Sequence, residues 1–433
     1  MKKPINGFSK LDKSQKINWL IKNFFSSDKE VKKIIEKYFN NDKKLQNLHD
    51  EFAENTISNF YLPFSVAPNF LINEKYYTIP MVTEESSVVA AASKAAKFWL
   101  ERGGFKASVL STQKVGQVHF LYKENHQKLE NYFQKIKPKL LNDASSITEN
   151  MKKRGGGIKS IELINHSEKL KNYYQILATF ETKDAMGANF INSCLEQFSK
   201  TLKENYDDPS NIEIIMSILS NYVPNCLVKA EVSCKIDQLS DNTIENPQEF
   251  ADNFIRAVKI AHIDKYRAVT HNKGIMNGID SVIIATGNDF RAIESAAHAY
   301  ASKNGEYKSL TKASISNNIF NFSIEIPLSL GTVGGLTKLH PLANLALKLL
   351  GNPSSKDLME ITAVAGLAQN FAAIKSLITT GIQHGHMKMH LINILNQYNA
   401  SDDEKIKAIE YFKSNNVNYN NVNTFIDKLR NDK

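Results

Sequence analysis

The middle of the chain alternates between strand-like and helix-like patterns over about a hundred residues, and this alternation restricts the folds open to it. Apolar runs and amphipathic stretches with a helical period follow one another closely there. The strand-like runs span 115–122, 158–165 and 173–182, and the helix-like stretches span 126–137 and 189–203. Pro138 predicts the end of the first helix, because proline lacks a backbone donor. We therefore expect a separate α+β domain within the chain.

The segments on either side of this region are mostly helical. Helices are predicted within 11–39 and at 87–100 and 360–380, and strands at 76–82 and 322–327. A chain of 433 residues exceeds what one hydrophobic core usually organises. We predict a discontinuous large domain of residues 1–111 and 221–378, an inserted domain of residues 112–220, and a helical terminal segment of residues 379–433.

Composition limits which classes of protein this chain can belong to and which partners it can bind. No stretch has the roughly 20 uncharged apolar residues of a membrane-spanning helix, and the N-terminus lacks the apolar region of a secretory signal. We expect a cytoplasmic protein with no membrane partner. The three cysteines lack metal-ligand spacing. The net charge of +9 suits a phosphate-bearing ligand or a nucleic acid, but the lysines are scattered, so a solvated basic surface explains most of it.

The segment HNKGIMNGIDSVIIATGNDFRAIESAAHAYASKNG, residues 271–305, combines charged and glycine-rich features. Lys273 stands beside Gly274 and near Gly278, and we expect these glycines to open the backbone to a substrate. A β-branched apolar run and a turn follow, and residues 290–301 predict a helix that Asn288 or Asp289 caps. The local pattern alone favours a buried helix, a capping aspartate and a solvated lysine.

Long motifs throughout the chain carry a family resemblance. Besides HNKGIMNGID, ATGND and AHAYAS, they are PMVTEESSVVAAASKAAK, KDAMGANFIN, MSILSN, VGGLTKLHPLA, AVAGLAQNFAA and GIQHGHM. In this order they resemble hydroxymethylglutaryl-CoA reductase of the bacterial, soluble class II type. The resemblance implies an α+β fold with a large, mostly helical domain that binds the coenzyme A substrate. It also implies an inserted nicotinamide-cofactor domain, non-classical Rossmann-like or ferredoxin-like, and a helical C-terminal flap; the fingerprint G-x-G-x-x-G is absent.

The resemblance implies a reaction and four catalytic residues. Two hydride transfers, each from its own reduced nicotinamide cofactor, interconvert (S)-3-hydroxy-3-methylglutaryl-CoA with (R)-mevalonate and coenzyme A, through mevaldyl-CoA thiohemiacetal and mevaldehyde. Lys273 would stabilise the developing oxyanion, Glu85 would be the acid, and His386 would protonate the coenzyme A thiolate. We expect Asp289 to join Glu85 and Lys273 in one network.

The resemblance also implies the residues that bind the substrate. Arg267 would hold the free carboxylate, for which a guanidinium fork is suited. The remaining candidates are Ser87, Thr270, Asn277 and Asn221. Three departures from the family pattern accompany them: Ser58 and Ser86 replace a usual glycine and a usual proline, and Leu336 replaces a small residue.

For the cofactor, the resemblance points to the DAMGAN segment, which follows a predicted strand and opens a predicted helix. Its candidate residues are Asp184, Met186, Gly187 and Asn189. Thr148 stands where NAD-preferring members have an aspartate, and threonine would not repel a 2′-phosphate. Lys152, Lys153 and Arg154 could attract that phosphate, whereas Glu149 opposes it. We therefore favour NADPH over NADH, and the biosynthetic direction over mevalonate catabolism.

The expected partners are hydroxymethylglutaryl-CoA or mevalonate, coenzyme A, and further copies of the chain. The family's active sites lie between subunits, so a homodimer or a trimer of dimers is implied. We expect no nucleic acid and no metal, because the histidines around His386 lack supporting carboxylates. Two alternatives remain: an enzyme of this fold that mainly oxidises mevalonate, and a non-catalytic basic binding protein. Loss of any of the four catalytic residues would favour the second, and all four are present.

Overall fold

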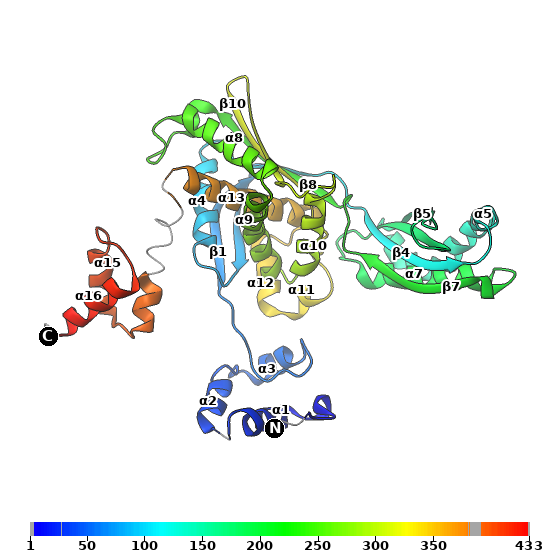
Figure 1. Ribbon diagram of the computed structural model, residues 1–433, viewed down its shortest axis with the longest axis horizontal. Coiled ribbons are helices and arrows are strands. Elements are labelled where there is room, and N and C mark those ends of the chain that lie inside the picture. Colours follow the sequence, from blue (N-terminus) through cyan, green and yellow to red (C-terminus); the bar gives the residue numbers. More distant parts are fainter. Residues whose placement is uncertain (1–3, 27, 380, 382–390, 432–433) are drawn as a thin grey trace. The chain divides into compact units, whose positions relative to one another are not determined.

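The computed structural model describes residues 4–26, 28–379, 381 and 391–431 (Figure 1). The chain separates into two compact units, Met1–Pro63 and Phe64–Lys433. The first unit contains the short η1 (Phe8–Lys10) and the helices α1 (Lys13–Phe24), α2 (Lys29–Lys37) and α3 (Lys43–Asp50).

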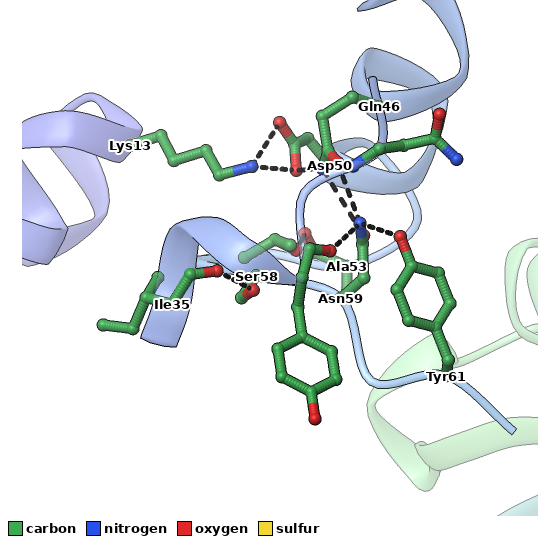
Figure 2. Close-up of polar contacts among 11 residues, drawn as sticks. Lys13, Ile35, Gln46, Asp50, Ala53, Ser58, Asn59 and Tyr61 are labelled. Atoms are coloured by element: carbon green, nitrogen blue, oxygen red, sulfur yellow. Dashed lines mark hydrogen bonds and ion pairs between the residues drawn. The ribbon is translucent and has the colours of Figure 1, made fainter. Parts of the chain in front are cut away.

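Aspartates begin each α-helix of the first unit, and polar side chains tie its helices together. Asp12, Asp28 and Asp42 are N-caps whose carboxylates accept from backbone N–H groups. The Lys13 ammonium lies 2.8 Å from the Asp50 carboxylate, and the Ser58 hydroxyl donates to the Ile35 carbonyl at 2.7 Å. Both contacts are drawn in Figure 2. The serine at the position of the usual glycine therefore joins its loop to α2.

Outside the inserted region, the second unit contains two sheets and a helical core. A hairpin pairs β1 (Phe64–Ile72) with β2 (Lys75–Val82), and a separate antiparallel sheet has the order β3-β8-β10-β9. These four strands are β3 (Lys106–Val109), β8 (Leu227–Lys235), β9 (Thr311–Ser316) and β10 (Ile319–Pro327). The helices are α4 (Val88–Leu100), α8 (Pro247–Ile263), α9 (Lys265–Ala285), α10 (Phe290–Ala301), α11 (Leu336–Leu339), α12 (Pro341–Leu349) and α13 (Ser355–Ile378), with η3 (Ile236–Leu239).

Helices α9 and α13 cross closely inside this core (Figure 1). A Cβ at Gly278 would lie 2.5 Å from the Ala365 carbonyl oxygen, and one at Gly366 would lie 2.7 Å from Ile279. Gly278 therefore serves close helix packing. The expectation that Gly274 and Gly278 open the backbone is wrong, because both lie within the continuous helix α9. The β-branched run 282–284 is helical too, since burial in the core overrides its strand propensity.

The inserted region forms its own antiparallel sheet of order β5-β6-β4-β7, with a separate hydrophobic cluster. Its elements are β4 (Lys114–Tyr122), α5 (His126–Asp143), α6 (Ser145–Lys153), β5 (Gly157–Asn165), β6 (Tyr173–Glu181), α7 (Ala188–Glu204), η2 (Pro209–Asn211) and β7 (Ile212–Ser220). The βαββαβ succession with this strand order is ferredoxin-like. The predicted α+β class is confirmed.

Helix α5 does not end at Pro138, which corrects the sequence prediction. Its buried residues continue past the proline, from Leu129 and Phe133 to Ile136 and Leu140. Burying Leu140 on the same apolar face favours continuation of the helix at the cost of one backbone hydrogen bond.

Among the described residues, α13 alone has the length and hydropathy of a membrane-spanning helix, and most of it is buried inside the molecule. The described part of the C-terminal region includes α15 (Asp402–Tyr411) and α16 (Tyr419–Asn431). Leu395, Ala408, Val422 and Ile426 are buried together there, and Arg430 contacts Glu404 at 2.9 Å.

Candidate active site

An ion pair joins helix α9 to the loop between β2 and α4. The Nζ of Lys273 lies 2.5 Å from Oε2 of Glu85, and the two side chains are 57% and 39% exposed. The loop is shaped locally: the Glu85 N–H donates to the Thr83 hydroxyl, and Ser87 adopts φ 72° as the N-cap of α4. The Ser87 hydroxyl donates to the Ser86 carbonyl at 2.6 Å. The pair therefore remains reachable from solvent on a firmly shaped loop.

The other candidates on α9 share a face with Lys273. At about 100° per residue, Arg267, Thr270, Lys273 and Asn277 fall within an arc of about 120°. Arg267 is half-buried, and burial lowers the pKa of its guanidinium. The Thr270 hydroxyl donates to the Tyr266 carbonyl at 3.2 Å. One helix face can thus present a guanidinium, a hydroxyl, an ammonium and an amide to one ligand.

A buried network beneath this face was not foreseen from the sequence. The His271 Nε2 lies 2.7 Å from the Thr311 hydroxyl, which donates to Asn370 Oδ1 at 3.1 Å. The Asn370 amide in turn donates to the His271 carbonyl at 3.2 Å. Burial, helped by the Arg267 and His262 charges, lowers the pKa of His271 to about 3. A neutral imidazole therefore ties α9, two positions before Lys273, to β9 and α13.

Asp289 lies at the far end of α9, where it caps α10. Its Oδ1 accepts from the Arg291 and Ala292 N–H groups at 3.1 and 3.2 Å, which confirms the predicted cap. Asp289 lines a cavity of about 750 Å³ together with Met186, Gly187 and Asn189. It also lines a smaller one, about 200 Å³, with Asn221.

The expected network of Glu85, Lys273 and Asp289 is only half formed within one chain. The twelve residue steps from Lys273 to Ala285 rise about 18 Å along α9. Asn288 is held at the end of this helix, because its N–H donates to the Ile283 carbonyl. No ion pair or hydrogen bond joins Lys273 to Asp289 among the residues described. Lys273 and Asp289 belong to the same stretch of sequence, but the length of α9 keeps them apart.

The loop between β6 and α7 borders the large cavity, as the DAMGAN prediction requires. Gly187 has φ 88°, and a Cβ there would lie 2.4 Å from Thr182. A Cβ at Gly331 would lie 2.6 Å from the Met186 nitrogen. Leu336 also lines this cavity, so the large residue at that position borders the candidate cofactor site.

Two predicted cofactor residues are occupied elsewhere. The Asp184 carboxylate accepts from the Ser355 N–H at 2.7 Å, so it fastens the loop to the start of α13. Thr148 is fully buried, and its hydroxyl donates to the Ser145 carbonyl. Neither lines the large cavity, whereas Arg154 does. His386 lies outside the described residues, and within the described ranges no group of three or more His, Cys, Asp or Glu could hold a metal ion.

Comparisons with known proteins agree on one family. The sequence model for hydroxymethylglutaryl-coenzyme A reductase matches residues 14–391. The reductase of Archaeoglobus fulgidus is 36% identical, covering 95% of this chain and 91% of that one. A probable reductase of Borreliella burgdorferi is 34% identical over 85% of each chain.

Solved structures give the same result. The class II reductase of Streptococcus pneumoniae bound to NADPH in open conformations has a TM-score of 0.72 and 38% identity, covering 89% of this chain and 92% of that one. Another structure of the reductase from that organism has a TM-score of 0.73 and 36% identity, covering 98% and 99%. With the paired cation and carboxylate and the large cavity, these findings define an NAD(P)H-dependent oxidoreductase. The chain belongs to the hydroxymethylglutaryl-coenzyme A reductase family.

Proposed function

We propose that the chain reduces (S)-3-hydroxy-3-methylglutaryl-CoA to (R)-mevalonate and coenzyme A, in the cytoplasm, within the mevalonate route to isoprenoids. The observation that carries this proposal is the contact between Lys273 and Glu85 on a solvent-accessible helix face. Thioester reduction builds negative charge on a carbonyl oxygen, and a fixed ammonium stabilises such charge. A carboxyl group beside that ammonium can deliver a proton to the same oxygen.

Each candidate residue has its own role in the proposed reaction. Lys273 stabilises the oxyanion of the thiohemiacetal, and Glu85 protonates the oxygen when mevaldehyde becomes mevalonate. Expulsion of coenzyme A gives a thiolate, and His386 protonates it so that the thiolate does not return to the aldehyde. Two reduced nicotinamide cofactors, bound in turn, would each supply one hydride. Arg267 holds the free carboxylate of the substrate, and Ser87, Thr270, Asn277 and Asn221 fix its other oxygens.

The active site is completed by a second copy of the chain. Lys273, in contact with Glu85, lies near the middle of α9, while Asp289 lies beyond the C-terminal end of that helix, beside the large cavity. A rise of about 18 Å exceeds the reach of a lysine side chain. Asp289 of a second copy must therefore approach Lys273 for the three groups to act together. A homodimer, or a trimer of dimers, satisfies this requirement through two-fold symmetry.

NADPH is the proposed cofactor, held by the inserted domain of residues 112–220. Met186, Gly187 and Asn189 line a cavity whose volume is in the range of ligand sites. Arg154 lines the same cavity and is suited to a 2′-phosphate. Thr148 and Asp184 contribute indirectly. Thr148 packs inside the inserted domain, and Asp184 holds the loop between β6 and α7 against the start of α13. Residues 1–111 with 221–378 form the substrate domain, and residues 379–433 form the flap.

The test measures oxidation of NADPH and NADH by the purified chain with hydroxymethylglutaryl-CoA, and identifies mevalonate among the products. Faster consumption of NADPH is expected. A rate that is larger only in the reverse direction, from mevalonate, coenzyme A and an oxidised dinucleotide, would favour catabolic oxidation. No turnover in either direction by a chain that binds the thioester would refute catalysis and leave a binding protein.

A further inference from the structure

Lys114, the first residue of β4, is a buried lysine that the proposed reaction does not use. Its side chain is 4% exposed. Its Nζ donates to the Thr182 hydroxyl at 2.6 Å, to the Ala185 carbonyl at 2.9 Å and to the Met186 carbonyl at 3.0 Å. All three hydrogens of an ammonium are therefore used, and all three acceptors belong to the loop between β6 and α7.

Burying an ammonium costs free energy unless hydrogen bonds or an opposite charge compensate it. Lys114 has no carboxylate within ion-pair distance among the described residues. The nearby Glu181 is engaged instead by the Thr112 hydroxyl and the Lys183 N–H. Burial lowers the pKa of Lys114, while Cys226 and Glu181 act in the other direction. The charge is held by the neutral oxygens of one loop.

The geometry of a trans peptide shows what these bonds achieve. The C=O and N–H of one peptide unit point in opposite directions. With the Ala185 and Met186 carbonyls turned toward Lys114, the N–H groups of Met186 and Gly187 are turned away from it. The Met186 N–H is taken up by the parallel bridge between Ala185 and Val333, whereas the Gly187 N–H donates to no acceptor within the described part of the chain. Both residues line the cavity of about 750 Å³. The free Gly187 amide, at the start of α7, is a favourable position for an anion.

We propose that Lys114 is a positioning residue that holds the loop 182–187 so that the Gly187 amide, at the start of α7, faces the pyrophosphate of the dinucleotide. This inference rests on the proposed function, because it assumes a dinucleotide in the cavity. The Thr182 hydroxyl completes the arrangement: it accepts from Lys114 and donates to the Ala185 carbonyl at 2.7 Å. The positive charge beneath the loop also favours a phosphate above it.

The test uses the full-length Lys114→Met variant, which keeps the chain length of the side chain and removes its donors. Direct binding of NADPH is followed by its fluorescence, and KM is measured for NADPH and for hydroxymethylglutaryl-CoA. The Kd and KM for NADPH should rise at least tenfold, while the KM for the thioester stays within twofold. Lys123→Met is the matched control, because Lys123 follows the other end of β4 and is exposed; it should bind NADPH as the unchanged chain does.

A second variant covers the case in which Lys114→Met does not fold. Thr182→Val removes the bridging hydroxyl with little change of shape, and it should raise the Kd for NADPH by a smaller factor in the same way. Unchanged NADPH binding in a folded Lys114→Met chain, or in Thr182→Val, would overturn the inference. Failure of the proposed function would look different, since the unaltered chain would bind NADPH and turn over no thioester.

Discussion

The Lys273 ammonium donates to the Glu85 carboxylate at 2.5 Å across 188 positions of sequence. The contact joins the middle of α9 to the loop that begins α4, so the two groups are positioned by separate elements of one core. Both side chains stay partly exposed, which leaves them able to exchange some of this contact for contacts with a substrate.

Replacing Lys273 by alanine should slow thioester reduction by about 10² to 10³-fold, because a positioned donor to a developing oxyanion typically contributes that much. Steady-state kcat with hydroxymethylglutaryl-CoA measures this. Lys259→Ala, at an exposed lysine of α8, is the control and should keep the original rate. A near-normal kcat for Lys273→Ala would move the role to another cation.

Glu85→Gln should leave substrate binding intact and stop mevalonate formation. The amide oxygen can still accept from Lys273, so the loop keeps its contact, but the side chain no longer carries an acidic proton. Binding of the thioester by calorimetry and mevalonate production together measure this outcome. Full mevalonate production by the variant would show that another group is the acid.

Subunit sharing can be tested with two inactive variants, Lys273→Ala and Asp289→Asn. If one subunit supplies Lys273 and its partner supplies Asp289, a mixed dimer contains one intact site. Random pairing should then restore about a quarter of the original activity. Co-expression with separate tags and an assay of the mixed species measures this. Absence of recovery in an isolated mixed dimer would place both residues in one subunit's site.

His386→Gln should damage thioester reduction far more than reduction of added mevaldehyde. Only the first reaction releases a coenzyme A thiolate that needs a proton. The two rates, measured with the same enzyme and cofactor, give the comparison. Equal losses in both reactions would exclude thiolate protonation as the role of this histidine.

Stability should fall below neutral pH because of His271. Its pKa is about 3 in the folded chain and about 6.5 when exposed, so between these values only the unfolded chain binds the proton. Its contribution is fully present above pH about 6.5 and is lost as the pH falls toward 3, by up to about 1.4 kcal/mol per pH unit. Urea unfolding at pH 7 and pH 5 should show a steeper loss than in His271→Gln. Equal slopes in the two proteins would contradict this.

Local patterns predicted much of the fold, because helix caps and amphipathic periods depend on residues that are close together in the sequence. The Asp289 cap and the succession of strands and helices in the inserted domain are examples. Long-range burial was harder to predict: it carries α5 through Pro138 and makes the run after Gly278 helical. In both cases the deciding contact comes from a distant segment.

The candidate site was likewise predictable from the sequence only in part. Family motifs pointed to Lys273 and Glu85, and the two residues meet. The same motifs could not show that Asp289 lies at the other end of a helix, or that the Asp184 carboxylate is taken by a backbone N–H of α13. Lys114 carries no recognisable motif, and a lysine at the start of a strand ordinarily indicates a solvated end.

The bond between Asp184 and Ser355 gives α13 a mechanical role. At its first turn this helix holds the loop that borders the large cavity, and its last residue, Ile378, leads toward the segment that carries His386. Twenty-four helical residues resist bending and stretching, so the helix acts as a strut of about 36 Å. A ligand that shifts the loop at the cavity would therefore shift the first turn of α13. Because the helix is rigid, its last residue, from which the chain continues toward His386, would move with it.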